Sequence, residues 1–560
     1  TGLMTYRLFN LTYVRHIELE RLAKNQYNNP SALLAGRGNI YFSDYSSGGK
    51  KNAASNKFSS YLYSNNSLVS SRSAAESIAP LLNRNVVELE SLLSQKDKNY
   101  LVLARNLSKE QADKIKALKL PGLTVASEIS RFYNNEMLAA PVLGFVGFNG
   151  NQRAGQYGVE FSYDDTLSGA LKTLDLRGNR TYSGILKSLK FWEKNENKLA
   201  DGANESRVGG DIVLTVDANI QSMIEVRLRA LLEKWDAVAG SIIVQDPSTG
   251  AILAMASSPS FNPNNYADYK LENFLNPNVQ ELFEPGSSFK PITMAAAIDS
   301  GAVTPDTTYN DTGEVRVGSY TIRNFDEKAN GIQTMRQVLQ HSLNTGAIFA
   351  QEKTGDDKFL NYVVGFGFGQ KTGVDLGGEV SGNISNLYSG RKINFLTASF
   401  GQGIAVTPLQ LISGYSAIAN GGRLMKPYAV KEIVRSDGTK IETKPLVLGA
   451  PIKEQTSVQL KTMLVDVVEK GFDKARITGY DVAGKTGTAQ IPDPNGGYLE
   501  HDQFIHDFVG FAPAYSPRFT ILIKMDKPKG IKFAADSLSP VFGDIARYLI
   551  RYFNIPPTKN

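Results

Sequence analysis

The stretch that most limits what this chain can fold into is residues 284–291, Glu-Pro-Gly-Ser-Ser-Phe-Lys-Pro. Its Pro-Gly pair predicts a turn, and the apolar run 292–298 that follows, ended by a glycine, predicts a buried helix. Ser287 then lies at the start of that helix, with Lys290 three residues later on the same face. A serine hydroxyl becomes a good nucleophile only when a neighbour takes its proton. Burial at an apolar helix start would lower the pKa of Lys290 and allow it to do so.

A Ser-x-x-Lys tetrad is weak evidence by itself. The chain has two more, Ser47 to Lys50 and Ser389 to Lys392, and both lie in polar, Gly/Ser-rich stretches that we expect to be loops. With only a tetrad, a capping serine and a solvated lysine would be the better interpretation. Two further motifs reverse this balance in favour of chemistry at Ser287.

The second motif is Ser342-Leu-Asn344, between two stretches of helical pattern at 334–340 and 346–351. A serine and an asparagine two residues apart in a short break between helices can both point into one cleft. The hydroxyl can then relay a proton, and the amide can donate and accept hydrogen bonds. When the pair is considered alone, helix capping is the simpler interpretation.

The third motif is Lys485-Thr486-Gly487-Thr488, which we expect in a sheet strand where Gly487 lets a backbone or a substrate come close. Lys485 and the two threonine hydroxyls would form a ledge that binds a carboxylate. A second Lys-Thr-Gly, at 371–373, follows a Gly-rich turn and has no apolar run before it. We therefore expect that copy to lie outside any sheet and to have no part in the site.

Composition excludes several other kinds of site. The chain contains no cysteine, which excludes disulfides, thiolate metal sites and a cysteine nucleophile. Its 4 histidines form no zinc-binding pair, and no Gly-x-Ser-x-Gly elbow with a downstream histidine stands out. The net charge of +6 is spread without a dense basic run, so we expect no nucleic-acid partner.

The 560 residues exceed one ordinary domain. We expect a first region, 1–208, without catalytic residues and with a flexible insertion near 43–73, where Ser, Asn, Gly and Lys predominate. A polar, Gly-rich linker at 199–210 should be a boundary that few contacts cross. From 209 to 560, strands enclose a helical middle, which predicts an α+β fold with an antiparallel sheet flanked by helices.

The three motifs, in this order, resemble the signature set of penicillin-binding proteins and serine β-lactamases. The flanking stretches 246–255, 284–291 and 401–411 are similar to those of class B penicillin-binding proteins, which are monofunctional peptidoglycan D,D-transpeptidases. The resemblance is dense from about 210 to 556. It implies the transpeptidase fold that these proteins share with serine β-lactamases.

The front region carries a thinner resemblance. Arg37-Gly38-x-Ile40 and Gly158-x-Glu160 resemble the elongated α+β pedestal, or dimerisation, domain of the same family. The chain departs from the family after Ile40, where relatives carry a compact Asp-Arg-Asn-Gly turn and this sequence continues with Ser and Asn.

The resemblance implies roles for eight residues. The catalytic set is Ser287, Lys290, Ser342, Asn344 and Lys485. The substrate-binding set is Thr486, Gly487 and Thr488. The serine would attack the carbonyl between the two terminal D-alanines of a peptidoglycan stem peptide, with backbone N–H groups of Ser287 and Thr488 around the oxyanion. The mechanism that the resemblance implies needs no metal and no cofactor.

Other activities use the same motifs. A β-lactamase would need a positioned carboxylate for deacylation, a D,D-carboxypeptidase would pass the acyl group to water, and a non-catalytic wall-assembly scaffold would not need all three motifs. As partners, the resemblance implies stem peptides and β-lactams, a glycosyltransferase and other wall-synthesis membrane proteins. No apolar run reaches the ~18 residues of a membrane span. The resemblance implies one N-terminal membrane anchor, which would lie upstream of Thr1, with the domains on the extracytoplasmic side.

Overall fold

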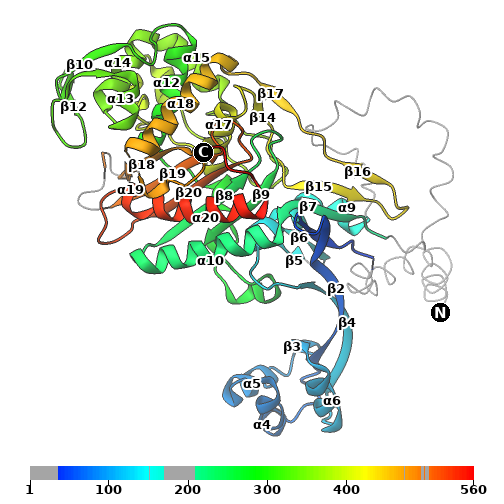
Figure 1. The fold of residues 1–560 in the computed structure, drawn as a ribbon. Coiled ribbons are helices and arrows are strands. Elements are labelled where there is room, and N and C mark those ends of the chain that lie inside the picture. Colours follow the sequence, from blue (N-terminus) through cyan, green and yellow to red (C-terminus); the bar gives the residue numbers. More distant parts are fainter. Residues whose placement is uncertain are drawn as a thin grey trace, which may run out of the picture.

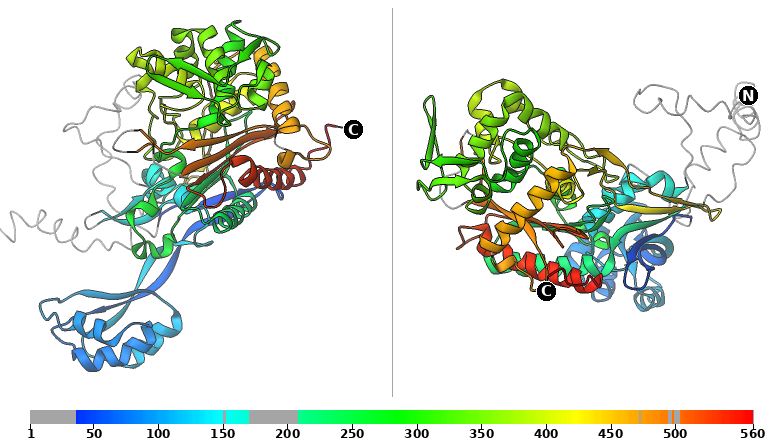
Figure 2. Two further views of the ribbon diagram at one scale, coloured as in Figure 1. Left: turned by 90° about the vertical axis from the view of Figure 1, so that its left-hand side faces the viewer. Right: turned by 45° about the horizontal axis from the view of Figure 1, so that its top comes forward.

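The structure is a computed structural model that describes residues 36–149, 152–169, 208–471, 473–493, 497–498 and 503–559. A large body carries a narrow extension that ends in a small lobe of helices (Figure 1). The turned view in Figure 2 shows that a ribbon of strands joins this lobe to the body. The predicted α+β fold, an antiparallel sheet flanked by helices and preceded by an elongated front module, is confirmed.

The sheet that carries the third motif has five antiparallel strands in the order β18-β19-β20-β8-β9. The strands are β8 (Ala239–Gln245), β9 (Ile252–Ser258), β18 (Ala483–Gln490), β19 (Phe504–Ala512) and β20 (Phe519–Asp526). Two of them precede the helical part of the chain and three follow it. The sheet therefore joins two distant parts of the chain and places β18 at one edge.

Helices cover both faces of this sheet. On one face α10 (Ala218–Trp235) and α20 (Ser539–Tyr552) lie together (Figure 1). On the other, α17 (Pro408–Ala419) packs against β8, β19 and β20, and all of its residues are buried. α18 (Glu454–Lys470) packs against β18. A helix that is buried all round, such as α17, fits a position between a sheet and further helices.

The helical part between β9 and β18 contains the first two motifs. Its main helices are α12 (Lys290–Asp299), α13 (Met335–Gln340), α14 (Asn344–Thr354), α15 (Asp356–Gly365) and α16 (Lys392–Ala398). Two small sheets lie beside them, formed by β10 (Thr308–Asp311) with β13 (Gly331–Thr334) and β11 (Glu314–Val317) with β12 (Tyr320–Arg323). α12 packs against α14, which begins at Asn344, and this contact brings the first two motifs together. α12 also packs against α18.

Local sequence explains where the long helices begin. The Asp217 carboxylate accepts hydrogen bonds from the Asn219 and Ile220 amides at 2.8 and 2.9 Å, which caps α10. Thr407 and Gln410 exchange hydrogen bonds as a capping box at the start of α17. Both caps satisfy amides that have no partner inside the helix.

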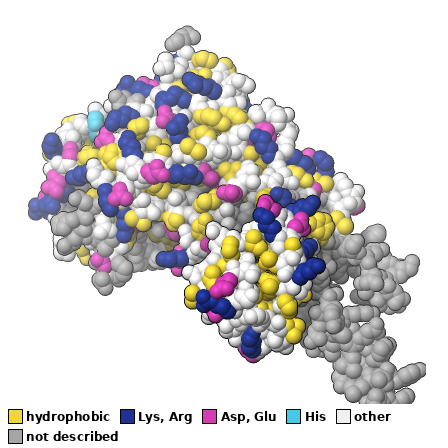
Figure 3. All heavy atoms as spheres, turned by 90° about the horizontal axis from the view of Figure 1, so that it is seen from below, with side chains coloured by type: hydrophobic (Ala, Val, Ile, Leu, Met, Phe, Trp, Pro, Cys, Tyr) yellow, Lys and Arg dark blue, Asp and Glu magenta, His cyan; other side chains and the backbone are white. Residues whose placement is uncertain are grey.

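The extension, here called the pedestal, consists of strands and a lobe. Its strands are β2 (Gly49–Ser64), β3 (Leu101–Leu107) and β4 (Leu123–Tyr133), and the lobe adds α4 (Ser71–Leu82), α5 (Val86–Leu93) and α6 (Lys109–Ala117). The lobe has an apolar cluster of its own, separate from the core of the body. Seen from below in Figure 3, apolar side chains lie between basic ones on this lobe.

The prediction of a flexible insertion near 43–73 is wrong. These residues form the end of β1 (Ile40–Asp44), a hairpin turn, the 16-residue strand β2 and the start of α4. β2 pairs with β4 in continuous register from Ala54 to Ser64, so its backbone groups have partners along that length. The polar composition arises because the ribbon stands away from the body and many of its side chains meet water.

The expectation that few contacts cross the boundary near residue 208 is also wrong. A seven-stranded sheet runs β16-β15-β7-β1-β2-β3, with β4 also paired to β2. β7 (Asp211–Asp217) pairs with β1 on one side and with β15 (Val430–Val434) on the other; β16 (Lys440–Glu442) forms the edge. A Cβ on Gly38 would lie 2.0 Å from the Gly210 carbonyl oxygen, so this glycine is required where the two regions meet.

Candidate active site

Ser287 and Lys290 meet at the start of the helix predicted for them. A single 3-10 turn, Gly286–Phe289, leads directly into α12. The Lys290 Nζ lies 3.0 Å from the Ser287 Oγ. Lys290 is 1% exposed, while Ser287 is only half-buried and can be reached from outside. The turn therefore presents the hydroxyl and hides the amine that accompanies it.

Ser342 completes this cluster from the break between α13 and α14. Its backbone has φ +56°, an uncommon value for a residue other than glycine. Lys290 Nζ donates to the Ser342 carbonyl and lies 3.2 Å from the Ser342 Oγ. Strained backbone of this kind persists where the surroundings hold it. Here the Ser342 carbonyl accepts from the buried amine, whose Nζ lies within 3.2 Å of both serine hydroxyls.

Asn344 is fixed by the neighbouring hairpin. Its side-chain amide donates to the Arg323 carbonyl at 2.9 Å, and its backbone amide donates to the Asn324 Oδ1 at 2.9 Å. Asn324 is itself held by the buried carboxylate of Asp311, to which it donates at 2.9 and 3.1 Å. The hairpin thus sets the position of the Ser-x-Asn break relative to Lys290.

Lys485 and the two threonines lie on β18, the edge strand beside the Ser287 turn. A Cβ on Gly286 would lie 3.2 Å from the Thr488 carbonyl oxygen, which shows how closely turn and strand pack. Gly487 is needed for a similar reason: a Cβ there would meet the Pro285 carbonyl at 2.5 Å and the Asp507 carboxylate at 2.2 Å. The close approach predicted at Gly487 thus comes from the protein's own backbone and from an acidic side chain.

The two threonines of β18 differ in their surroundings. The Thr488 Oγ1 accepts from the Ala534 amide at 3.2 Å, at the start of the short helix α19 (Ala534–Ser537). The Thr486 carbonyl accepts from Lys485 Nζ at 3.1 Å. Thr488 is partly exposed and Thr486 buried, so the outer end of the strand is the more accessible.

Burial and the neighbouring charges control the protonation of the two lysines. Burial, with repulsion from Lys485, holds the pKa of Lys290 well below its ordinary value. Burial lowers the pKa of Lys485 to about 7, while attraction to Asp507 opposes that change. Lys290 is therefore suited to accept a proton at neutral pH, and Lys485 is suited to remain the cation of the pair.

The two other Ser-x-x-Lys tetrads and the second Lys-Thr-Gly are not part of this cluster. Ser47 lies in the β1–β2 turn, and Lys50 is exposed on β2 with its Nζ 3.9 Å from the centre of the Tyr41 ring. Lys392 is exposed and bonded to Asp356 at 3.0 Å. The second Lys-Thr-Gly is a loop around the Glu379 carboxylate, as predicted, and its lysine is exposed.

Three residues of the site were not identified from the sequence: Asp311, Asn324 and Asp507. Asp507 interrupts the apolar strand β19, and a charged residue inside a buried strand is a signal that could have drawn attention to it. Asp311 and Asn324 lie in short polar segments where acids and amides are ordinary. Their role becomes visible only in the structure, where both contact the start of α14.

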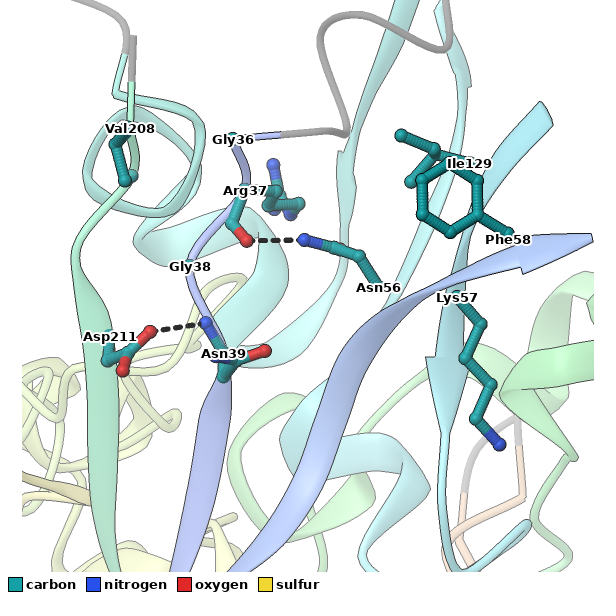
Figure 4. A pocket seen from close by; sticks show the side chains of 11 residues that line it. Gly36, Arg37, Gly38, Asn39, Asn56, Lys57, Phe58, Ile129, Val208 and Asp211 are labelled. Carbon is teal, nitrogen blue, oxygen red and sulfur yellow. Dashed lines mark hydrogen bonds between the residues drawn. The ribbon is translucent and has the colours of Figure 1, made fainter.

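A separate hollow lies where the pedestal joins the body. Its volume is about 450 Å³, and Arg37, Asn56 and Phe58 are among the residues that line it. Figure 4 shows Asn56 bonded to the Arg37 carbonyl, at 2.6 Å, and Asn39 bonded to Asp211, at 2.7 Å. None of the three motifs lines this hollow, so we assign it to the junction and not to the catalytic chemistry.

Beside this hollow, the two front-region motifs form a buried ionic cluster. Glu160 is fully buried and accepts from the guanidinium groups of Arg37 and Arg131, whose Nε atoms lie 2.9 and 2.7 Å from it. Attraction to the two arginines outweighs burial and lowers the pKa of Glu160.

Among the described residues, we find no helix with the length and apolar character that a membrane span requires.

Sequence-family comparisons match two regions. The penicillin binding protein transpeptidase domain matches residues 240–547, and the penicillin-binding protein dimerisation domain matches residues 32–173. Stage V sporulation protein D of Bacillus subtilis is 36% identical over 81% of this chain and 69% of its own length. Peptidoglycan D,D-transpeptidase FtsI of Escherichia coli is 30% identical over 86% of this chain and 77% of its own.

Solved structures have the same fold. Penicillin binding protein 3 of Mycobacterium tuberculosis, in complex with aztreonam, superposes with a TM-score of 0.65 at 29% identity, over 77% of this chain and 92% of that one. Penicillin binding protein 2X of Streptococcus thermophilus superposes with a TM-score of 0.70 at 22% identity, over 92% of this chain and 79% of that one. The body and the pedestal together thus correspond to a known arrangement.

Proposed function

Because the chain belongs to the class B penicillin-binding proteins, we propose that it is a serine D,D-transpeptidase that cross-links peptidoglycan stem peptides. One observation carries the assignment of its nucleophile. Lys290 Nζ lies within hydrogen-bond reach of the hydroxyls of Ser287 and Ser342, while burial and Lys485 hold its pKa low. A neutral amine between two hydroxyls can take a proton from one and pass it to the other.

The first half of the reaction forms an acyl-enzyme. The Ser287 Oγ bonds to the carbonyl carbon between the two terminal D-alanines, and its proton passes to Lys290 Nζ. The backbone N–H groups of Ser287 and Thr488 hold the oxyanion, each contributing about 3 kcal/mol in comparable enzymes. The C–N bond then breaks, and D-alanine leaves with the proton relayed through Ser342.

Substrate binding is assigned to β18 and to the Ser-x-Asn break. Lys485, with Thr486 and Thr488, binds the terminal carboxylate, and Gly487 keeps the strand close to the Ser287 turn. The side chain of Asn344 orients the peptide amide. In the second half, the amine of a neighbouring stem attacks the acyl carbon and gives its proton to Lys290. The ester bond to the Ser287 Oγ breaks, and this oxygen takes the proton back from Lys290, which restores the free serine.

The assignment of regions follows from the same premise. We propose residues 209–560 as the transpeptidase domain and the preceding residues as the pedestal that holds it at the wall. The substrate places the working protein on the extracytoplasmic side of the membrane. A glycosyltransferase is the expected partner, because it would supply the glycan strands whose stems are joined.

The nucleophile can be tested by mass spectrometry after incubation with labelled penicillin. We expect one adduct per chain, on Ser287, and none on the Ser287→Ala variant. Ser47→Ala and Ser389→Ala remove the serines of the two other tetrads and should label as the wild type does. An adduct that persists on Ser287→Ala would overturn the assignment.

The fate of the acyl group is a second test. With a stem-peptide donor and an amine acceptor, a transpeptidase forms the cross-linked dimer. Free tetrapeptide as the only product would instead indicate a D,D-carboxypeptidase. Rapid release of hydrolysed penicillin would indicate a β-lactamase.

A further inference from the structure

Asp507 is a buried carboxylate that the proposed reaction does not use. It lies on β19 directly opposite Gly487 of β18, and it is fully buried. Directly opposite residues of an antiparallel pair point to the same face, and so do residues two apart on one strand. The side chain of Asp507 therefore shares a face with that of Lys485. Such diagonal neighbours have Cα atoms about 7–8 Å apart, within reach of a long side chain.

This carboxylate lacks the partners that burial ordinarily requires. Neither of its oxygens accepts a hydrogen bond from the residues that the structure describes. The Ser288 hydroxyl is close to it but donates to the Pro285 carbonyl, at 2.8 Å. An isolated, ionised buried carboxylate is strongly destabilising, so such a group either takes up a proton or is accompanied by a charge of opposite sign.

Two lysines on the same sheet could supply that charge. Lys524 of β20 lies opposite Asp507, but its Nζ is bound by both carboxylate oxygens of Asp526, each at 2.6 Å. Tyr415 approaches from α17, and its hydroxyl donates to the Ser288 carbonyl. Because Asp526 already compensates Lys524, Lys485 is the main source of positive charge for Asp507.

We propose that Asp507 is a positioning residue that keeps the positive charge on Lys485 and so leaves Lys290 as the neutral, proton-accepting amine. Two buried lysines that repel each other cannot both be charged cheaply. A single carboxylate beside one of them decides which carries the proton. The inference rests on the proposed function, since it concerns how the two lysines share the work of acylation.

The electrostatics agree with this arrangement. Burial raises the pKa of Asp507 to about 7, and attraction to Lys485 and Lys524 opposes that rise. Attraction to Asp507 likewise opposes the lowering of the Lys485 pKa. The pKa of Lys290 is lowered by burial and by Lys485, with no carboxylate among its causes.

The test compares the full chain with its Asp507→Asn variant, which keeps the shape and removes the charge. Acylation rate constants are measured from about pH 5 to about pH 10 with benzylpenicillin and with its methyl ester, which has no carboxylate for Lys485 to bind. In the variant, the loss of rate at high pH should begin about one to three pH units lower, because Lys485 loses its partner. At pH 8 the penicillin rate should fall about tenfold or more, and the ester rate less than about threefold.

Asp375→Asn is the matched control. It also removes a carboxyl charge, at a partly buried residue that accepts from the Ala429 and Val430 amides at 2.7 and 2.9 Å and from the Tyr163 hydroxyl at 3.1 Å, outside the site. Its pH profile with both compounds should equal that of the wild type. An equal loss of both rates in Asp507→Asn, as misfolding would cause, or an unchanged high-pH limb would overturn the inference. Absence of any adduct on the wild-type chain would overturn the proposed function itself, and the inference with it.

Discussion

Two lysines of the same chemical type acquire different properties from their neighbours. Lys290 and Lys485 are both almost fully buried, yet among the residues that the structure describes only Lys485 has an attracting carboxylate beside it. Lys290 contacts two serines instead. Residue identity alone would treat them as equivalent, whereas the local charges and hydroxyls distinguish the proposed base, Lys290, from the proposed carboxylate-binding cation, Lys485.

Replacement of the two Lys-Thr-Gly lysines should have unequal effects. Lys485→Ala should lower the rate of penicillin acylation about 10- to 100-fold, because the carboxylate loses a charge-assisted partner. Lys371→Ala changes an exposed loop lysine and should leave the rate within about twofold. Stopped-flow acylation kinetics of both variants make the comparison. Equal losses would mean that the wrong copy has been assigned to the site.

His506 should make the fold sensitive to acid. Its ring bonds to the Ser537 hydroxyl at 2.9 Å, and burial lowers its pKa to about 4. The unfolded chain takes up a proton near pH 6.5 that the folded chain refuses, so stability falls as the pH drops from about 6.5 to about 4. The loss approaches about 3 kcal/mol for this one group.

His506→Gln should therefore flatten that part of the stability profile. Urea unfolding at several pH values gives the free energy of unfolding for each protein. The difference between wild type and variant should shrink, or change sign, as the pH falls. A constant difference across the range would contradict the role given to the buried imidazole.

The strands and helices position the site and the front-region cluster through their contacts with neighbouring elements. β18 presents its motif because it is an edge strand beside the Ser287 turn, and the β11–β12 hairpin holds Asn344 through Arg323 and Asn324. In the front region, Glu160 of the short helix α8 (Gly158–Ser162) ties together Arg37 and the strand residue Arg131.

Glu160→Gln should destabilise the protein strongly. It leaves buried Arg131 without its carboxylate and Arg37 with only the partly exposed Asp164, and breaking such a cluster costs about 3–5 kcal/mol. The exposed pair of Glu76 with Arg72 serves as control, and Glu76→Ala should cost less than about 1 kcal/mol. Chemical denaturation with intrinsic fluorescence measures both. A loss below about 1 kcal/mol in Glu160→Gln would show that the cluster is not structural.

The front region and the body share a sheet and an apolar core, although the two family matches divide the chain into separate domains. β7, the first strand after residue 210, lies between β15 and β1. One apolar cluster includes Ile40 and Val159 of the front region together with Leu214 and Ile292 of the body. The pedestal lobe, in contrast, has its own small core at the far end of the ribbon.

A fragment that begins at Asp211 should accordingly be impaired. Removal of β1 leaves β7 as an unpaired edge strand. It also exposes apolar side chains of the body that the front region had covered, and both changes favour aggregation. We expect a clearly lower melting temperature and poor solubility. Deletion of the lobe together with β3, residues 65–122, with a short linker from β2 to β4, should be tolerated far better. A fragment from Asp211 that melts like the full chain would contradict the shared-sheet interpretation.

The sequence alone was enough to predict the three motifs, the helix at Ser287, the strand at Lys485 and the α+β class. These depend on short-range patterns: a turn before an apolar run, glycine at a crowded strand position, and alternation of strands with helices. The same short-range reasoning misjudged residues 43–73, because polar composition reports exposure to water and not the absence of backbone pairing. Only the tertiary structure decided the partner of Lys485, the brace on Asn344 and the sheet shared by both regions. Each of these joins residues far apart in the chain, and their contacts exist only once the strands are in register.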